Sequence, residues 1–575
     1  MKKVYLLGLL FLAAQVSNAQ KVTISGEILD LKTGEPVVGV TVYDTLSGEG
    51  SYTNAFGFFS IIVSNENTYL RFSSVGYKTT YVKANAENGP MEIKLEANSN
   101  ELSGVVIQAD KVDVSQEVES TQMSVVKLNP EEISKIPSLG GEVDILKVAQ
   151  LMPGVAKAGE GQSGMLVRGG TADQNLVILD DATVYNLSHL FGFFSVFNND
   201  AIRDVTIYTG GFPAQFGGRL SSVMDVRMAE GGAQKFSGKG GVGLLSSRLT
   251  LNVPIVKDKG AVMISGRRTY IDQVFKTVGV TLPYYFYDLN LKANYKLSNK
   301  DHLYLSSYFG NDVLSFTENT GNAEFEVEGG ESQELGFGFQ LGNFTSTLRW
   351  THVYKEGKLF HNVTAFQTRF KYDIGGSFLD NNILIKSQIQ DYGAKVDWDY
   401  NAIEHHRIKF GASFTNHGFR PNIVNTSGDI TDFLQNRKGD LILSQEVGAY
   451  IVDDFKVNNR LSLNYGLRLS GSLTEGTPYG GIEPRTSAKY TVVQNHSLKF
   501  SYSRMKQYMH RVSSSSVVLP TDLWYPVTEN VAPQSSHLMA LGYFGGLEKW
   551  SVNYSVEGYY KYMQNLIEYK EGAQL

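Results

Sequence analysis

The chain contains no cysteine among its 575 residues, which excludes a disulfide framework and metal sites built from thiolates. Proline is scarce, with 14 residues, and no apolar run beyond the first twenty residues is long enough for a membrane-spanning helix. The net charge is only −6 and no block of basic residues occurs, so nucleic acid is not an expected partner. If the protein crosses a membrane, it must do so as a barrel of strands.

Glycine and aromatic residues are abundant, with 58 Gly, 32 Tyr and 31 Phe, a mixture that favours long strands with aromatic girdles. The segment RLSLNYGLRLSG (460–471) has a period of two, with leucines and Tyr465 on one face and Arg460, Arg468 and small polar residues on the other. Similar segments run for about ten residues, near the length that a tilted strand needs to cross a bilayer. We therefore predict lipid on the leucine face and a polar lumen on the arginine face.

The connections between these strands alternate between short and long. Short turns are predicted at 257–260, 298–301, 355–358, 402–405, 457–460 and 492–496. Long polar stretches, predicted to be loops, lie at 311–333, 420–443 and 509–535. Outer-membrane barrels have this asymmetry, with short periplasmic turns and long external loops. About fifteen strands can be counted from Phe236 onward, an odd number, whereas single-chain bacterial barrels have an even one.

Residues 1–19 have the features of a secretory signal peptide. Lys2 and Lys3 begin it, an apolar run of 11 residues follows at 4–14, and small residues before Gln20 predict cleavage there. The alternative is a membrane anchor, but the apolar run is well short of the ~20 residues of a spanning helix.

Residues 20–98 contain short strand-like segments separated by turn residues, which predicts a small β-sandwich. The order GEILDLKTGEPVVGVTVY, NAFGFFSI and SSVGYKT resembles the carboxypeptidase regulatory-like domain, which has a transthyretin-like fold. That domain is the non-catalytic companion of a protease, so the resemblance implies no peptidase activity. Asn54 holds the place of an aspartate that is usual in the family.

Residues 116–232 carry the most specific motifs, MLVRGGTADQNLVILDDATVYN and IRDVTIYTGGFPAQFGGRLSSVMDV. They resemble the plug domain of TonB-dependent outer-membrane receptors, and segments of 233–575 such as SGRRTYID and IEPRTSAKY resemble the barrel of that family. With the leading sandwich, the chain resembles a receptor of the Bacteroidetes type. The implied fold is dominated by β-structure: an outer-membrane barrel of about twenty-two strands, filled by an α+β plug. With about fifteen strands present, the barrel is expected to be C-terminally incomplete, with about seven strands after Leu575.

The resemblance implies a receptor in the cell outer membrane that binds a scarce solute at the surface and imports it with energy from the inner-membrane TonB complex. The sandwich and the plug entrance would face the periplasm. In the linker 99–115, the β-prone run Val105, Val106, Ile107, Gln108 and Ala109 is the candidate TonB box, to which TonB would bind by strand addition. The alternative is an ordinary last strand of the sandwich.

Three plug residues, Arg168, Asp180 and Asp181, are candidates for a latch between plug and barrel. The resemblance places Arg168 at the plug–barrel boundary, where a buried carboxylate would hold it; a surface turn arginine is the alternative. His189 and Phe191, in the aromatic-rich loop SHLFGFF, are candidates for solute contact, with core packing as the alternative.

Neither catalysis nor a cofactor or metal site is predicted, so the chain is not expected to be an enzyme. The spacing of 238–243 fits GxGxxG, but the segment lies on a predicted strand with no helix after it. The imported solute is open between siderophore, cobalamin, peptide and glycan, and a surface lipoprotein is an open partner. The alternative function is a non-transporting outer-membrane protein that binds its ligand for signalling or adhesion.

Overall fold

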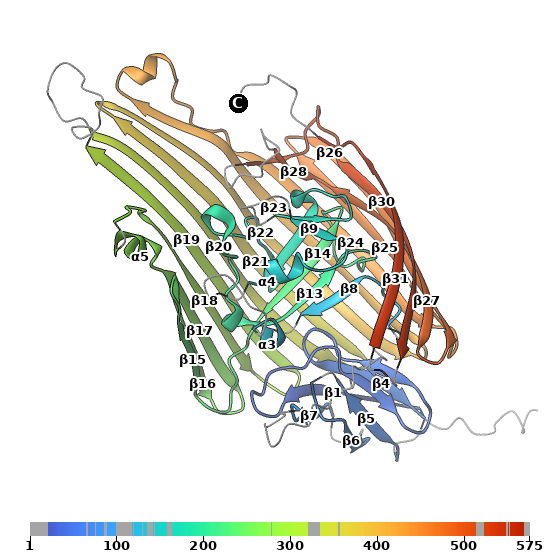
Figure 1. Cartoon of the computed structure of the whole chain (residues 1–575). Helices are drawn as coiled ribbons and strands as arrows, with labels where there is room; N and C mark the ends of the chain where they lie inside the picture. The colour runs from blue at the N-terminus through green and yellow to red at the C-terminus, as the bar shows by residue number, and fades with distance from the viewer. Residues whose placement is uncertain are drawn as a thin grey trace, which may run out of the picture.

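The computed structural model describes residues 21–98, 118–319, 334–512 and 522–567, with short gaps inside these ranges, the longest at 135–141 and 158–163. The predicted signal peptide and the candidate TonB box lie outside the described residues. A large curved sheet surrounds a central domain, and a small domain lies at one end of the sheet (Figure 1).

The small N-terminal domain is a sandwich of two sheets, ordered β4-β1-β7 and β3-β2-β5-β6. Alternate residues of its strands point inward, and Ile24, Ile28, Phe59 and Phe72 are part of one buried core. The predicted β-sandwich is therefore present. Its strands are β1 (Val22–Asp30), β2 (Thr41–Asp44), β3 (Gly50–Tyr52), β4 (Phe58–Val63), β5 (Tyr69–Ser73), β6 (Thr80–Lys83) and β7 (Met91–Leu95).

The central domain, which we call the plug, is built on a five-stranded mixed sheet ordered β12-β11-β14-β13-β8. Strands β11 and β14 are parallel, and short helices cover the sheet, so the predicted α+β character is present. Its elements are β8 (Val125–Leu128), α3 (Pro130–Ile133), α4 (Ile145–Ala149), β9 (Val155–Lys157), β10 (Met165–Val167), η2 (Ala172–Gln174), β11 (Asn175–Leu179), β12 (Ala182–Thr183), η3 (Leu190–Gly192), η4 (Asn199–Ala201), β13 (Ile202–Tyr208) and β14 (Ser222–Met228).

The large sheet, which we call the barrel wall, has fifteen strands within the described residues, as counted from the sequence. Each strand pairs antiparallel with its neighbours. The strands are β15 (Ser237–Val242), β16 (Ser246–Val256), β17 (Gly260–Thr269), β18 (Tyr284–Lys296), β19 (Asp301–Asn319), β20 (Glu334–Tyr354), β21 (Leu359–Phe378), β22 (Asn381–Ile403), β23 (His406–Ser427), β24 (Ile442–Lys456), β25 (Leu461–Thr474), β26 (Thr477–Val493), β27 (His496–Gln507), β30 (Gln534–Leu547) and β31 (Val552–Gln564), with α5 (Ile271–Thr277) between β17 and β18 and η7 (Asp429–Asp432) between β23 and β24.

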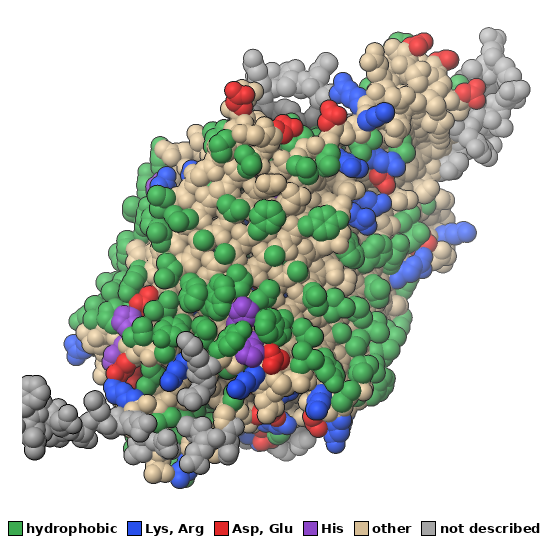
Figure 2. Space-filling view, turned by 180° about the vertical axis from the view of Figure 1, so that it is seen from behind, with side chains coloured by type: hydrophobic (Ala, Val, Ile, Leu, Met, Phe, Trp, Pro, Cys, Tyr) green, Lys and Arg blue, Asp and Glu red, His purple; other side chains and the backbone are tan. Residues whose placement is uncertain are grey.

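The two faces of the wall differ as the sequence predicts. Along β25, Leu467 and Leu469 are exposed on the outer face, whereas Arg468 and Ser470 are buried on the inner face, where Arg468 donates to the carbonyl oxygen of Ala214 in the plug. Figure 2 shows hydrophobic side chains over the middle of the outer face and charged side chains gathered toward both ends. Within the described part of the chain, no helix has the length and apolar character needed to cross a membrane.

The predicted short turns are present, and we call the end of the wall where they lie the short-turn end. The prediction that three whole stretches are loops is wrong. β19 continues to Asn319 and β23 to Ser427, and residues 509–535 include the hairpin of β28 (Met509–Val512) and β29 (Leu523–Pro526). The strands extend past the segments with alternating side chains because hydrogen bonds between the backbones of neighbouring strands continue there. These bonds do not require apolar side chains on either face.

Candidate functional site

The first contact between plug and wall is built on Asp180, in the two-residue hairpin turn between β11 and β12. Its φ of 48° lies in the left-handed region, which aspartate tolerates. The fully buried carboxylate accepts hydrogen bonds from Lys292 of β18 at 3.0 Å and Ser306 of β19 at 2.7 Å. Burial opposes its ionisation, but Lys292 and Arg349 outweigh that effect and hold the pKa of Asp180 below its ordinary value.

Its neighbour Asp181 holds three cations from different strands. Arg349 of β20 donates to its carboxylate at 2.6 Å, Arg227 of β14 at 3.3 Å, and the Lys395 Nζ of β22 lies 3.6 Å away. Burial opposes ionisation here as well, yet these cations keep the pKa of Asp181 well below its ordinary value. Because Arg349 and Lys395 belong to the wall and Arg227 to the plug, Asp181 ties the two bodies together.

Arg168 makes a separate contact with the wall. It follows β10 with φ of 48°, and its Nη2 donates to Glu557 of β31 at 2.9 Å and to Ser124 Oγ at 2.6 Å. Its guanidinium carbon also lies 5.0 Å from the ring centre of Tyr559. The structure therefore places Arg168 against the wall but not against Asp180 or Asp181, and its role as a latch stays a prediction.

His189 lies between two wall carboxylates. Its Nδ1 is 3.0 Å from Asp312, its Nε2 is 3.3 Å from an oxygen of Asp288, and its ring stacks on Phe286 at 3.6 Å. Burial lowers the pKa of His189, but Asp288 and Asp312 outweigh it and raise the pKa to about 9. The ring is 1% exposed, so protein partners occupy it here, and direct solute contact stays a prediction. The side chain of Phe191 lies outside the described residues.

His189 predicts a pH dependence for the plug. Its folded pKa of about 9 exceeds the ordinary 6.5, so its ion pairs contribute fully below about pH 6.5 and are lost as the pH rises through 9. We expect the free energy of plug unfolding to fall by about 3 kcal/mol across that window. Denaturation of the purified protein from roughly pH 6 to pH 10 measures it. His189→Asn should lose this slope and the control His496→Asn should keep it; equal slopes in wild type and H189N would refute the assignment.

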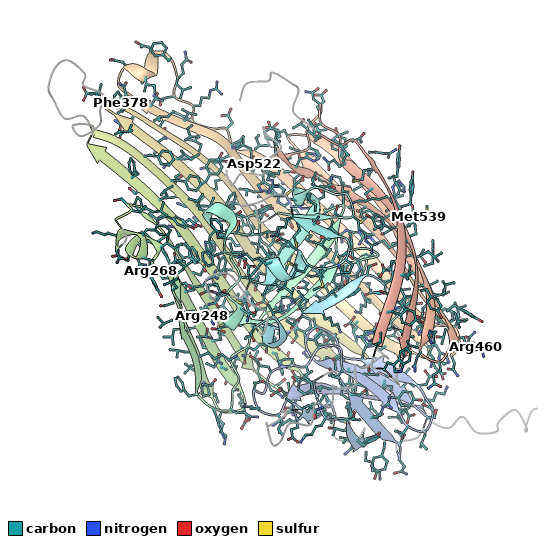
Figure 3. All side chains as sticks on the ribbon, in the orientation of Figure 1. Arg248, Arg268, Phe378, Arg460, Asp522 and Met539 are labelled. Carbon is teal, nitrogen blue, oxygen red and sulfur yellow. The ribbon has the colours of Figure 1, made fainter. Side chains whose placement is uncertain are left out.

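Other wall arginines hold plug loops, although the sequence does not single them out. Arg485 of β26 donates to the carbonyl oxygens of Pro213 at 2.6 Å and Phe216 at 2.7 Å. Arg248 of β16, labelled in Figure 3, lies 2.7 Å from Asp200 of the plug. The available signal was an arginine at a lumen-facing position of an alternating strand, but many such positions exist.

Side chains of both plug and wall extend into the space between them (Figure 3). A cavity beside Phe216, Lys395 and His417 has a volume of about 120 Å³. Pockets for small-molecule ligands are typically about 300–1,000 Å³, so this cavity is smaller than such a pocket. Among the described residues, no group of three or more His, Asp or Glu side chains is arranged to hold a metal ion. The plug therefore lies against the inner face of the wall and is held there by buried ion pairs.

Known structures share this architecture. The siderophore receptor PirA from Acinetobacter baumannii superposes with a TM-score of 0.56 at 15% identity, covering 78% of this chain and 71% of that one. The ferric enterobactin receptor PfeA from Pseudomonas aeruginosa gives 0.56 at 13% identity, covering 79% and 73%. The copper transporter OprC gives 0.56 at 10% identity, covering 78% and 72%. At these identities the likeness concerns the fold alone.

Sequence comparisons identify the family. Residues 24–107 match the CarboxypepD_reg-like domain, residues 117–222 the TonB-dependent Receptor Plug Domain, and residues 266–574 the TonB dependent receptor-like beta-barrel. TonB-dependent receptor P3 of Formosa agariphila is 27% identical over 134 residues, covering 23% of this chain and 13% of that protein. The barrel match alone spans more than half of the chain, which therefore belongs to the family of TonB-dependent receptors.

Proposed function

We propose that this chain imports a scarce solute from the cell surface into the periplasm with energy supplied through TonB. The observation that carries the proposal is that a folded plug lies against the inner face of the wall and is tied to it through Asp180, Asp181 and Arg168. A solute captured on the outer side cannot diffuse past such a domain. Passage requires work on the plug, and TonB-dependent receptors reside in the outer membrane, where TonB reaches them from the inner membrane.

The orientation follows from the turns. Short turns face the periplasm in outer-membrane barrels, so we assign the short-turn end, with the N-terminal domain, to the periplasm. The linker 99–115 joins the N-terminal domain to the plug and would then lie where TonB can bind it. Its run Val105, Val106, Ile107, Gln108 and Ala109 is our proposed TonB box, which would add a strand to TonB.

We propose four candidate classes for the imported solute. Siderophore, cobalamin, peptide and glycan are the candidates, and metal complexes are the first to test because PirA, PfeA and OprC are named for siderophores and copper. A surface lipoprotein is a further proposed partner.

Deletion of the gene tests the proposal. Mutant and parent cells are supplied with radiolabelled members of each solute class, and surface binding on ice is compared with accumulation at growth temperature. We expect the deletion to abolish both for one class and complementation to restore both. Restored binding without accumulation would overturn import and favour the receptor for signalling or adhesion.

A further inference from the structure

The N-terminal domain lies across the short-turn end of the wall (Figure 1). It contacts four consecutive hairpin turns of the wall, those between β18 and β19, β20 and β21, β22 and β23, and β24 and β25. The contacts are Glu92 with Lys296 at 3.1 Å, Ser25 packed against Gly357, Lys21 with Glu404, and Glu49 with Lys456 at 3.2 Å. The domain is therefore seated on a long arc of the rim.

One loop of the domain reaches past the rim to the plug. Asn54 shapes this loop, because its Oδ1 accepts hydrogen bonds from the backbone N–H groups of Phe56 and Phe58. The ring of Phe56 lies 5.5 Å from that of Phe360 in the wall. It also lies under two guanidinium groups, 5.1 Å from Arg349 and 5.9 Å from Arg227. These two arginines bind Asp181, so the loop covers this plug–wall contact from the short-turn end.

The domain also binds the end of the plug directly. Glu35 accepts hydrogen bonds from the backbone N–H of Glu230 at 2.8 Å and of Gly231 at 3.0 Å. Arg203 of the plug donates to the carbonyl oxygen of Ala55 at 3.1 Å. Contacts to both wall and plug mean that the domain covers the seam between them, where a solute would leave.

The interface combines a few polar contacts with partly exposed ion pairs. Asn54 Nδ2 donates to Asp399 Oδ2 at 3.2 Å, and Arg407 donates to the carbonyl oxygen of Tyr52 at 3.0 Å. Glu49 and Lys456 retain 28% and 31% of their side-chain exposure, and partly exposed ion pairs of this kind contribute little each. Apolar packing against the wall is limited to a small cluster of Phe58, Val353 and Phe360 with Phe56 beside it. The core of the domain is separate from this cluster, so the domain can leave the rim without unfolding.

We propose that the N-terminal domain is a detachable cap, a second barrier in series with the plug. Docked, it closes the seam at the short-turn end; released, it opens that exit. The assignment of this exit to the periplasm rests on the proposed function, but the docking and release do not. Because the linker 99–115 joins cap and plug, a pull on the linker acts on both barriers.

Thiol labelling of the purified full chain tests the cap, since the protein has no cysteine of its own. Ser25→Cys places a thiol at the interface, where Ser25 is 4% exposed. Lys78→Cys reports an exposed position of the cap, and Ala84→Cys reports its core. We expect S25C to react with a charged maleimide at least roughly ten-fold more slowly than K78C and ten-fold faster than A84C. High salt should accelerate S25C several-fold, because it screens the rim ion pairs, and leave A84C unchanged.

A second pair of variants locates the contact that holds the cap. Phe56→Ala in the S25C background should speed labelling roughly ten-fold, because the aromatic and cation–π contacts are lost. Tyr81→Ala, at an exposed position of the cap, should leave the rate unchanged. Labelling of S25C as fast as K78C would show that the cap is not docked. Labelling as slow as A84C, at every salt concentration and in F56A, would show that it does not detach. Neither result depends on the import of a solute.

Discussion

Replacing Asp181 with asparagine is expected to lower the free energy of plug opening by about 3–5 kcal/mol. The carboxylate is the shared partner of Arg349, Arg227 and Lys395, all within 3.6 Å. Asparagine keeps the size of the side chain and tolerates the left-handed φ of 76°. The change in free energy therefore reports the removal of the negative charge alone. Three cations would then face each other with one fewer anion in a buried site, which is the costly way to break a buried ion pair.

Amide hydrogen exchange along β11 and β14 measures this effect, because those strands form the centre of the plug sheet. The matched control is Asp258→Asn, an aspartate in a turn of the wall with a similarly left-handed φ of 60°. It should leave exchange in the plug unchanged. If D181N protects the plug as well as D258N does, the plug is not held by this contact.

Proline at position 106 is expected to abolish solute uptake while leaving surface binding intact. Strand addition depends on main-chain hydrogen bonds, and proline removes one donor and does not fit inside a strand. Surface binding depends on the outer side of the receptor, which the change does not touch. Accumulation and binding of the labelled solute by whole cells separate the two effects.

The control for this variant is Val106→Ala, which shortens the side chain and keeps the backbone donor. It should retain most of the uptake, because main-chain pairing does not depend on the valine side chain. Both variants must reach the outer membrane in equal amounts. Normal uptake by V106P would place the TonB contact elsewhere in the chain.

The sequence predicts the barrel well because strand periodicity is a local property. Alternation alone separates Leu467 and Leu469 on the outer face from Arg468 on the inner face, and the structure confirms it. The strand ends within 311–333 and 420–443 cannot be predicted from alternation alone. Ladder pairing such as Glu318 with Leu335 extends strands where side-chain alternation has faded.

The partners in the site could not be predicted because they come from strands far apart in sequence. Arg168 reaches Glu557, 389 positions away, and nothing in the local pattern distinguishes that glutamate from others in the wall. The sequence indicates Asp180 and Asp181 as candidates, but the choice of Lys292 and Arg349 as their partners depends on how the sheet curves around the plug. His189 lies in an aromatic-rich loop, and the sequence of that loop does not predict that the carboxylates of Asp288 and Asp312 flank the ring.

We propose that solute crosses this plugged barrel only when TonB supplies energy. The most direct measurement is accumulation of the labelled solute by cells that carry the receptor, with and without TonB, at equal surface binding. We expect accumulation to fall to the level of receptor-free cells when TonB is absent, while binding stays unchanged. Equal accumulation with and without TonB would contradict it.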